Sequence, residues 1–508
     1  MKRALSGHGS TSIIILVAAL SLVSCTEQWD EHYYKQAAGK SELSLFEFIE
    51  SQSDLTIFTS MLQQTGYDTV LNKSQVYTVW APTNEALQGF DLLDSANVLK
   101  IVTGHIAWFS YPVREAQEKT IIMLNNKRIF FTTDGTNHYF DGKLILRQDQ
   151  AVRNGLVHVL DGYVPYRSNI WEYLLQASGI DSLQTYVNSL FSYELDGEAS
   201  FDENGMLIDS VLESTNYFLT NLGAFDNEDS VYTCVIPDNE GWNEGLARIS
   251  PYFNILESEG GAAVQTAYSK LYLVNNLFFS GRYKVPVSSE TLTSTGGMTF
   301  TNPDTLFSGG ELIELSNGYV YKTSSFPYLA AESWLKEVRV EAEDSQDNFR
   351  LTNNYKVNTT SSVGTGYDVS GGYYITAVPT SSSATSKLFV RFPITSVLST
   401  KYNIYVVFVP SCIIDKTDKR PYKVNFYLSY IDEKGESVSD SKIVSNAITD
   451  STSMTKMLVA ENFQFSYCNI NTPQNSTVNI RVENAATVKA TEYNRTIRID
   501  CIILEPVQ

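Results

Sequence analysis

A short motif that occurs twice constrains the fold of this chain more than any other feature. The stretch "VYTVWAPTNEAL" (residues 76–87) reads as an apolar strand ending at a proline, and "VYTCVIPDNEGW" (residues 231–242) repeats it 231 − 76 = 155 residues later. In both copies the proline is followed by Thr-Asn or Asp-Asn and then Glu, residue types that cap the first turn of a helix. The motif therefore predicts, twice, a strand that runs directly into a capped helix.

Two further segments recur in the same order, which favours a duplicated domain over a chance resemblance. "IVTGHIAWFSYPV" (101–113) has a weaker counterpart in "YLVNNLFFSGRYKVPV" (272–287), and "RNGLVHVLDGYVPY" (153–166) has one in "SNGYVYKTSSFPY" (316–328). Three ordered matches at nearly one offset indicate an internal repeat. A chain of 508 residues has room for about three domains, so a third domain is expected after the second copy.

The N-terminus carries the marks of an export signal. Lys2 and Arg3 precede an apolar run at residues 13–23 that is too short to span a bilayer, and "LVSC" follows at 22–25. This tetrapeptide resembles a bacterial lipobox, which implies a signal peptide at 1–24 and lipidation of Cys25. An ordinary signal peptide with a coincidental cysteine is the alternative.

The resemblance also implies a destination. Residues 25–40 would be the lipidated tether, and the acidic residues Glu27, Asp30 and Glu31 resemble the export signal of Bacteroidetes surface lipoproteins. We therefore expect an outer-membrane lipoprotein, exposed at the cell surface and held in the membrane by its lipid alone.

The charge balance excludes one class of partner. The 57 Asp and Glu outnumber the 37 Lys and Arg, the net charge is −20, and the chain contains no basic cluster. Because affinity for nucleic acid comes largely from cationic side chains, we expect no nucleic-acid partner.

The repeated segments resemble a known family. "YTVWAPTNEAL", "GHIAWF" and "NGLVHVLDGYVP" are similar, in this order, to the landmarks of a fasciclin domain. The resemblance implies a fasciclin-like domain at 41–167 and a degenerate one at 168–335. Helical spacing of apolar residues at 43–66, with Gly66 as a stop, followed by strands, predicts an α+β fold for this module.

The second copy departs from the pattern at three landmarks. Asp238 replaces the Thr of the box, Asn276 stands about where His105 does, and Tyr321 stands where His158 does. It also carries a polar insertion around residues 196–214. Fasciclin domains are generally adhesion or ligand-binding modules, so the resemblance implies a surface protein or a glycan as partner.

No reactive constellation is visible in the chain. The mature sequence has four histidines, His32, His105, His138 and His158, and lacks HExxH, GxSxG and phosphate-binding motifs. His158 alternates with valines, which is typical of a buried, hydrogen-bonded histidine, and His105 is interpreted in the same way. We expect no enzyme. A cryptic glycoside hydrolase accessory remains a third hypothesis, because carboxylate pairs are abundant.

The four remaining cysteines predict no metal centre. They show no CxxC spacing and no histidine at ligand spacing, and an oxidising envelope would permit disulfides whose pairing the sequence leaves open. Cys234, within an apolar strand, is interpreted as a small core residue. The cysteines are Cys234, Cys412, Cys468 and Cys501.

From residue 336 to 508 the sequence changes to short alternating strands. "KEVRVEAED", "KYNIYVVFVP" and "RTIRIDCIILEPV" alternate with a period of two, which predicts an all-β sandwich. Its two ends resemble those of galactose-binding-like carbohydrate-binding modules, which have a jelly-roll scaffold. That resemblance implies a structural calcium at Glu341, Glu343 and Asp500; an exposed acidic edge is the alternative. We expect no other cofactor.

Three tyrosines in a glycine-rich stretch are the candidate sugar-binding residues. "GTGYDVSGGYYITA" places Tyr367, Tyr373 and Tyr374 among glycines, where loops present rings for stacking on a sugar, although packing is the alternative role. The sequence thus predicts two α+β fasciclin-like domains and a terminal all-β sandwich. The expected function is adhesion or ligand binding. The alternative is glycan capture for a polysaccharide-uptake system.

Overall fold

The computed structural model describes residues 41–113, 119–200, 206–208, 210–344, 350–351, 355–383, 385 and 388–507. The predicted signal peptide, the tether and Cys25 lie outside the described residues. The chain divides into two compact units, residues 1–168 and 169–508. In the parts of the chain that the structure describes, no helix is long and apolar enough to cross a membrane.

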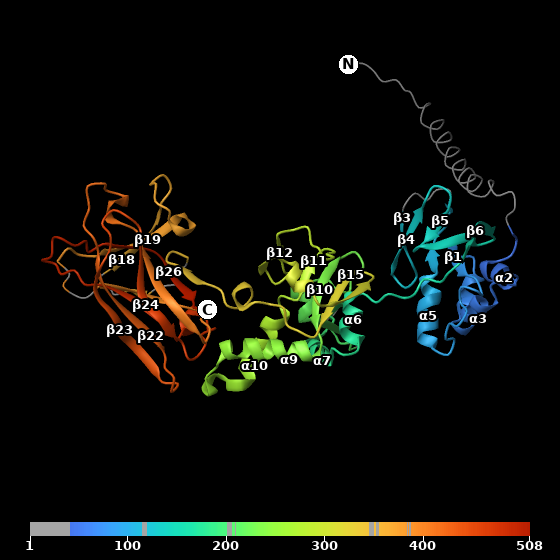
Figure 1. The fold of residues 1–508 in the computed structure, drawn as a ribbon, viewed down its shortest axis with the longest axis horizontal. Coiled ribbons are helices and arrows are strands. Elements are labelled where there is room, and N and C mark those ends of the chain that lie inside the picture. Colours follow the sequence, from blue (N-terminus) through green and yellow to red (C-terminus); the bar gives the residue numbers. More distant parts are fainter. Residues whose placement is uncertain are drawn as a thin grey trace, which may run out of the picture. The chain divides into compact units, whose positions relative to one another are not determined.

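The first unit contains helices that precede and follow the first repeated strand in the chain, and a mixed sheet with the order β2-β1-β7-β6-β5-β4-β3 (Figure 1). Its elements are α2 (Leu45–Glu50), α3 (Thr56–Gln64), α4 (Tyr67–Leu71), β1 (Tyr77–Pro82), α5 (Ser95–Gly104), β2 (Ile106–Trp108), β3 (Lys119–Ile122), β4 (Arg128–Thr133), β5 (His138–Phe140), β6 (Lys143–Val152) and β7 (Gly155–Leu160).

Strand β1 is buried along its whole length because each of its faces meets a separate core. Val79 and Ala81 pack with residues of α2, α3 and α5. On the opposite face Trp80 stacks on Phe140 of β5, with ring centroids 4.6 Å apart. The predicted stop at Gly66 is confirmed, since this residue follows α3 with a φ of +74°, a conformation that favours glycine.

The second unit begins with a smaller version of this sheet, in the order β11-β10-β15-β14. Its elements are α6 (Ile170–Gln176), α7 (Asp181–Ser189), β8 (Phe191–Leu195), α8 (Gly197–Ser200), β9 (Leu212–Asn216), the π-helix η2 (Phe218–Leu222), β10 (Tyr232–Pro237), α9 (Asn239–Ile249), η3 (Ser250–Phe253), η4 (Glu257–Glu259), α10 (Gly261–Val274), β11 (Phe278–Ser280), β12 (Thr291–Thr293), β13 (Thr299–Thr301), α11 (Asp304–Phe307), β14 (Glu311–Leu315) and β15 (Gly318–Thr323).

The two sheets share one pairing pattern. Strand β1 is parallel to β7 with Tyr77 opposite Gly155, and β10 is parallel to β15 with Tyr232 opposite Gly318. The antiparallel partners agree as well, because Trp108 of β2 lies opposite Tyr77 and Ser280 of β11 lies opposite Tyr232. Residues 76–82 and 231–237, the strands of the repeated motif, therefore occupy equivalent places in their sheets.

The predicted strand-to-helix junction is confirmed in the second copy and wrong in the first. Asp238 caps α9, accepting hydrogen bonds from the N–H groups of Glu240 and Gly241. In the first copy Thr83 accepts a hydrogen bond from the N–H of Ala86, but residues 84–89 form only turns. Gly89, with a φ of +80°, ends these turns, and the next helix starts after its own cap, Asp94.

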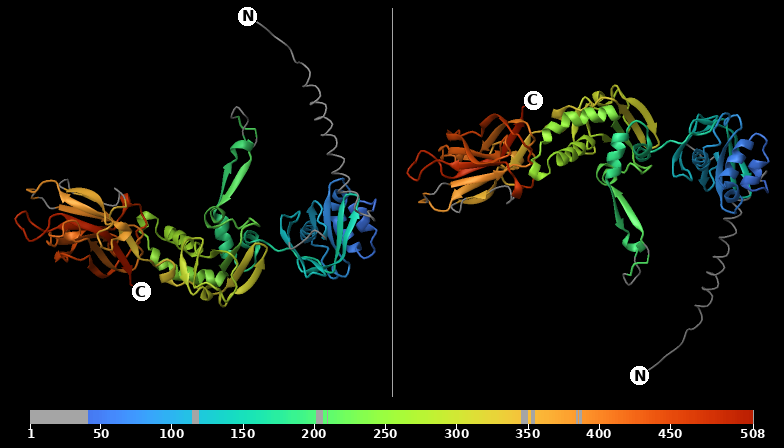
Figure 2. Two further views of the ribbon diagram at one scale, coloured as in Figure 1. Left: turned by 90° about the horizontal axis from the view of Figure 1, so that it is seen from above. Right: turned by 90° about the horizontal axis from the view of Figure 1, so that it is seen from below.

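The polar insertion of the second copy lies in a hairpin. Strands β8 and β9 form a separate two-stranded sheet that stands away from the rest of residues 169–508 (Figure 2). Several of its apolar side chains, including Tyr193, Leu195 and Leu212, are exposed. The segment is polar on average in the sequence because acidic residues alternate with these apolar ones.

The C-terminal part of the second unit consists of two antiparallel sheets around one core. The orders are β18-β19-β26-β21-β24, with β16 also paired to β26, and β17-β20-β25-β22-β23. Both sheets contribute to the same buried cluster. The strands are β16 (Val338–Glu341), β17 (Arg350–Leu351), β18 (Tyr355–Ser361), β19 (Tyr373–Pro379), β20 (Leu388–Pro393), β21 (Lys401–Phe408), β22 (Lys423–Ile431), β23 (Ser437–Ile448), β24 (Thr455–Gln464), β25 (Asn479–Asn484) and β26 (Ile497–Pro506).

Within the second unit, this β-region is joined to the preceding α+β part by a seam of backbone contacts. The N–H of Ser399 donates to Tyr252 O at 2.8 Å, and the N–H of Cys468 donates to Asn254 O at 2.9 Å. Leu398 and Cys468 also belong to the hydrophobic core of the α+β part. Residues 336–508 therefore share buried surface with the residues before them.

Candidate binding surfaces

The segment that follows His105 ends in two exposed aromatic side chains. Trp108 is 46% exposed and packs one part of its ring against Tyr77, with centroids 4.9 Å apart. Phe109 is 67% exposed and has a φ of +71°. Its N–H donates to Val76 O at 3.1 Å, and its carbonyl accepts from Thr78 Oγ1 at 2.9 Å. Both bonds hold this unusual backbone conformation in place.

The equivalent position in the second copy is a glycine. Gly281 has a φ of +107°, its N–H donates to Val231 O at 2.8 Å, and its carbonyl accepts from Thr233 Oγ1 at 2.8 Å. A bulky side chain is disfavoured in this region of backbone space, which glycine enters freely. Phe109 thus adopts a glycine conformation and presents a ring to solvent. In the sequence, Phe109 and Gly281 stand at similar positions of the two repeated segments, and this offset could have pointed to the pair. Only the strand register shows without ambiguity that the two residues correspond.

His105 is a structural residue, as predicted. It is fully buried; Nδ1 lies 2.8 Å from Ile101 O, and Nε2 accepts a hydrogen bond from the N–H of Val164 at 3.0 Å. Burial lowers the pKa of His105 to about 4, so the imidazole is neutral at neutral pH. Its equivalent was wrongly identified as Asn276. The carbonyl that bonds β1 is that of His105, and the carbonyl that bonds β10 is that of Leu277.

His158 is also buried and hydrogen-bonded. Nε2 lies 3.0 Å from Tyr111 O, and Nδ1 accepts from the N–H of Asp149 at 3.2 Å. Burial lowers the pKa of His158, and the nearby Asp149 carboxylate opposes that shift. The predicted correspondence with Tyr321 is confirmed: Tyr321 lies opposite Val235 as His158 lies opposite Trp80, and its hydroxyl donates to Tyr283 O at 3.2 Å.

The outer face of the five-stranded sheet carries a polar and aromatic platform that sequence reasoning missed. In adjacent strands Arg391, Arg481 and Tyr427 lie side by side in one row of the register. The guanidinium of Arg481 lies 3.7 Å from the centroid of the Tyr427 ring. In the next row, Glu483 accepts hydrogen bonds from Asn425 and from Tyr427. The platform consists of the partly exposed Phe389, Arg391 and Arg481 and of the buried Asn425, Tyr427 and Glu483.

The three predicted sugar-binding tyrosines do not form one surface. Tyr374 is only 1% exposed and packs in a small core, so its ring is not available for stacking and this assignment is corrected. Tyr367 is half-buried; its hydroxyl donates to Thr452 O, and Lys416 Nζ lies 5.2 Å from its ring centroid. Tyr373, at 48% exposed, is the one ring of the three with substantial exposed area. The strand β19 alternates its side chains, which separates Tyr373 from Tyr374.

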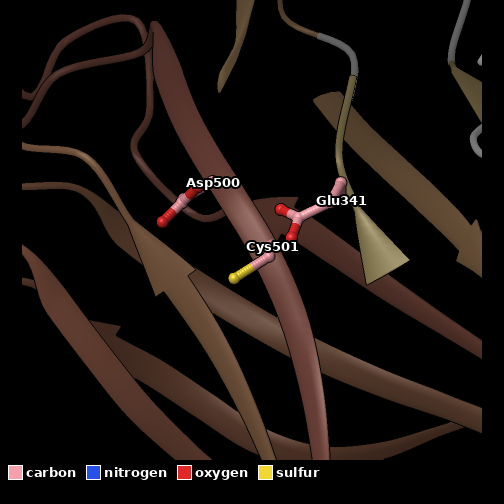
Figure 3. Close-up of side chains that lie close together, drawn as sticks. All are labelled: Glu341, Asp500 and Cys501. Carbon is pink, nitrogen blue, oxygen red and sulfur yellow. The ribbon is translucent and has the colours of Figure 1, made fainter. Parts of the chain in front are cut away.

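An acidic cluster lies where β16 meets β26 (Figure 3). Ligand atoms of Glu341, Asp500 and Cys501 lie within 4.8 Å of one another. Ser370 covers the cluster: its N–H donates to Asp500 at 3.3 Å and its hydroxyl to Glu341 at 2.5 Å. The prediction that Glu341 and Asp500 lie beside each other is therefore correct. The third residue of the group whose ligand atoms lie within 4.8 Å is Cys501, however, and not Glu343.

A β-bulge explains how consecutive residues come to share this cluster. Val406 of β21 lies opposite Ile502 and Phe408 lies opposite Ile499, so Asp500 and Cys501 together face the single residue Val407. At such a bulge, where two residues lie opposite a single residue, both side chains point to the same side of the strand. Without the bulge, alternation would send Asp500 and Cys501 to opposite faces.

Burial and mutual repulsion disfavour the charged forms of the carboxylates in this cluster. Asp500 is 3% exposed; burial and then the Glu341 carboxylate raise its pKa to about 7, against a hydrogen bond from Ser370 that lowers it. Burial also raises the pKa of Glu343 to about 7, with Glu341 and Asp500 adding to the shift. One carboxylate oxygen each of Glu341, Glu343 and Asp500 is buried without a hydrogen-bond partner.

The four described cysteines are buried thiols without a disulfide. Cys234 is confirmed as a core residue, completely buried in β10. Burial raises the pKa of Cys501 to about 12, so this thiol is protonated at neutral pH and is a poor ligand beside the carboxylates.

Comparison with known protein families matches one part of the chain. The model of the fasciclin domain matches residues 53–164. No curated protein matches the sequence. A FAS1 domain pair from the insect cell adhesion molecule fasciclin I is similar in structure, with 15% identity, a TM-score of 0.22 and coverage of 55% of this chain and 98% of the other.

Two further solved structures are similar at the same level. The N-terminal CBM22-1–CBM22-2 tandem domain from Paenibacillus barcinonensis Xyn10C has 12% identity and a TM-score of 0.22, with coverage of 34% of this chain and 46% of the other. A carbohydrate esterase from the Shiga toxin-encoding bacteriophage phi24B has 11% identity and a TM-score of 0.20, with coverage of 35% and 99%. On the match of its sequence to the family model, this chain contains a fasciclin domain at residues 53–164.

Proposed function

We propose that this protein is a non-catalytic binding protein of the cell envelope, which attaches to a surface protein or glycan through its fasciclin domain. The observation that carries the proposal is Phe109, an exposed ring on a backbone conformation that glycine occupies in the second copy. A non-glycine residue in such a conformation costs on the order of 1–3 kcal/mol and persists mainly where function requires it. Exposed, rigidly held aromatic side chains are typical anchors of binding interfaces.

The test is the substitution Phe109→Gly, which restores the residue found in the second copy. It should leave the fold intact and raise the free energy of unfolding by about 1 kcal/mol, because it relieves the backbone strain. Adhesion of the purified chain to arrayed matrix proteins and polysaccharides should fall at least tenfold. Phe130→Ala, an exposed phenylalanine on β4, is the matched control and should bind as the wild type does. Equal binding by Phe109→Gly and wild type would contradict the proposal.

The platform on the five-stranded sheet favours glycan capture as a second candidate function. The guanidinium groups of Arg391 and Arg481 are partly exposed and are held in place by the buried Tyr427 ring and by the Asp440 carboxylate, and polar groups fixed in this way can orient a sugar. Calorimetric titration of the whole chain with plant and host polysaccharides tests it. Arg481→Met should abolish binding, Tyr373→Ala should leave it unchanged, and Lys434→Met in an exposed turn is the control. If instead Tyr373→Ala abolishes binding and Arg481→Met leaves it unchanged, the sugar site lies at Tyr373.

We also infer that the chain is anchored at Cys25 as a surface-exposed lipoprotein of the outer membrane. The lipobox-like "LVSC" and the acidic residues after it support this localisation. Cys25→Ala should abolish labelling by a fatty-acid analogue and release the protein from membranes. Retained label on the variant would exclude Cys25 as the attachment point.

We propose that Glu341, Glu343 and Asp500 hold a structural calcium ion. Three buried carboxylate oxygens without hydrogen-bond partners fit a hard cation that prefers oxygen ligands. A bound ion would supply charge compensation between β16 and the end of β26. Calcium should raise the melting temperature of the wild type and leave that of Asp500→Asn unchanged; an equal response from both proteins would refute the site.

A further inference from the structure

The hairpin formed by β8 and β9 has two chemically different faces. Because side chains alternate along a strand and directly opposite residues share a face, the register sorts them. Leu195 lies opposite Leu212, and Tyr193 is on the same face. On the other face Glu194 lies directly opposite Glu213. We call this hairpin, residues 191–195 and 212–216 with the residues that continue it, the acidic arm.

The apolar face of the arm is uncovered. Tyr193, Leu195 and Leu212 are exposed, and Leu207 and Ile208, which lie between the two strands in the chain, are exposed as well. Figure 2 shows the arm standing clear of the remainder of its unit. A contiguous exposed apolar surface marks an interaction site, and a lone two-stranded hairpin is only marginally stable in water. The arm is therefore a structure that a partner would stabilise.

The arm is nevertheless held by side-chain hydrogen bonds at two places. At its base the side chain of Asn216 donates to Val187 O at 2.9 Å and accepts from the N–H of Phe218 at 3.0 Å. Farther out, the hydroxyl of Ser200 donates to Val211 O at 3.0 Å and accepts from the N–H of Val211 at 3.1 Å. These buried polar side chains keep the strands in one register, so the two faces are presented in a defined arrangement.

The charge of the region indicates what kind of partner fits. Directly opposed like charges such as Glu194 and Glu213 destabilise a strand pair. From residue 168 to residue 247 the sequence contains fifteen Asp and Glu and no Lys or Arg. The compensating cations must therefore come from outside this part of the chain.

The same charges disfavour two other occupants of the apolar face. A second copy of the chain would bring another acidic arm and a net charge of −20, and an anionic membrane surface would repel the glutamates. A β-strand that alternates cationic and apolar residues matches both faces at once, because its side chains alternate with the same period of two. In the described residues, β8 and β9 pair only with each other, so each has an outer edge to which a strand can add.

We propose that the acidic arm is a docking element for a protein partner that adds an extended segment of alternating cationic and apolar residues to the edge of β8 or β9. The cationic side chains lie on the face of Glu194 and Glu213, and the apolar ones lie on the face of Leu195 and Leu212. This contact is separate from the surfaces around Phe109 and Arg481.

The probe is an octapeptide of alternating Lys and Val, titrated against the whole chain at low salt. We expect binding that weakens at least tenfold in Glu194→Lys/Glu213→Lys and in Leu195→Ser/Leu212→Ser. The matched control is Glu433→Lys/Glu436→Lys, which reverses two exposed glutamates in another hairpin turn and should bind as the wild type does. An octapeptide of alternating Glu and Val should not bind the wild type.

Several results would overturn the proposal. These are failure of the Lys–Val peptide to bind, equal binding by the charge-reversed and wild-type chains, or equal binding of a Lys–Val peptide of the same composition with its charges grouped together. Sedimentation velocity that shows a dimer dissociated by Leu195→Ser/Leu212→Ser would assign the arm to a second copy. Binding of phosphatidylglycerol vesicles that depends on the same leucines would assign it to a lipid surface.

Discussion

The two copies of the repeat differ in most side chains but keep the same hydrogen bonds to the backbone. Asn154 accepts from the N–H of Leu45, at the start of α2, and donates to Leu71 O, at the end of α4. Asn317 accepts from the N–H of Ile170, at the start of α6, and donates to Phe225 O. Each asparagine thus ties a helix start to the chain that precedes the central strand.

The same agreement extends to the capped starts of α2 and α6. Ser44 and Glu47 form a capping box in the first copy, and Asn169 and Glu172 form one in the second. The copies diverge in exposed side chains: Trp108 and Phe109 of the first copy correspond in the register to Ser280 and Gly281 of the second, and among the described residues the acidic arm occurs only in the second copy. Buried backbone groups must be satisfied in both, whereas surface side chains are free to change.

The largest effect is expected for the glycines after these asparagines. A Cβ on Gly155 would lie 2.0 Å from Tyr77 O, and one on Gly318 would lie 1.9 Å from Tyr232 O. Gly155→Ala and Gly318→Ala should each lower the local stability by 4 kcal/mol or more, roughly, because the central strand must move. Hydrogen exchange of the full chain, resolved by peptide, measures this. Gly89→Ala, with positive φ but open space, is the control, expected to cost about 1 kcal/mol.

Substitution of the two asparagines should have the next largest effect on stability. Asn154→Ala and Asn317→Ala each leave buried backbone donors and acceptors unpaired, at a cost of about 3 kcal/mol. The loss should be confined to the altered copy in the exchange experiment. If one variant is as stable as the wild type, the two asparagines do not play equivalent parts and the comparison fails at this position.

The third prediction is that the stabilities of the two copies depend differently on pH. Unfolded, His105 takes up a proton near pH 6.5, whereas in the folded chain it does so only near pH 4. The unfolded state binds more protons between these values, so the stabilisation is complete above pH 6.5 and is lost as the pH falls towards 4. Between pH 6.5 and 5 the first copy should lose about 2 kcal/mol. His105→Leu, which copies Leu277, should remove the part of this pH dependence that comes from His105 and leave the part that comes from His158, while lowering stability at pH 7.

The second copy of the repeat serves as the control for His105→Leu. Leu277 does not titrate, so exchange protection of β10 and β15 should change little over the same pH range. A parallel loss of protection in both copies would show that other groups dominate the acid response.

The smallest effect concerns Tyr321, which replaces His158. Tyr321→Phe removes one hydrogen bond to Tyr283 O and should cost about 1 kcal/mol. His158→Phe removes two contacts, with Tyr111 O and with the N–H of Asp149, and should cost more. The reverse order, measured by the same exchange method, would mean that the tyrosine hydroxyl is the stronger partner.

Much of the fold could be predicted from local sequence pattern. The alternation in β16, β21 and β26, the central strands at 76–82 and 231–237, and the buried histidines follow from residue type and period. The candidate surfaces were less predictable. Tyr374 stood among glycines yet is buried, because it belongs to β19 and its ring packs in a small cluster with Val369, Val409 and Ile413.

The amino-acid sequence by itself determined which segments become buried strands, where the repeat lies and how acidic the second copy is. Only the tertiary structure decided which residues meet: the bulge that brings Asp500 and Cys501 to one side, the row of Arg391, Arg481 and Tyr427, and the opposition of Glu194 and Glu213. Alternation is a property of one strand, whereas register is a property of two strands. A shift of one residue moves every side chain to the other face, so these sites exist only once the strands have paired.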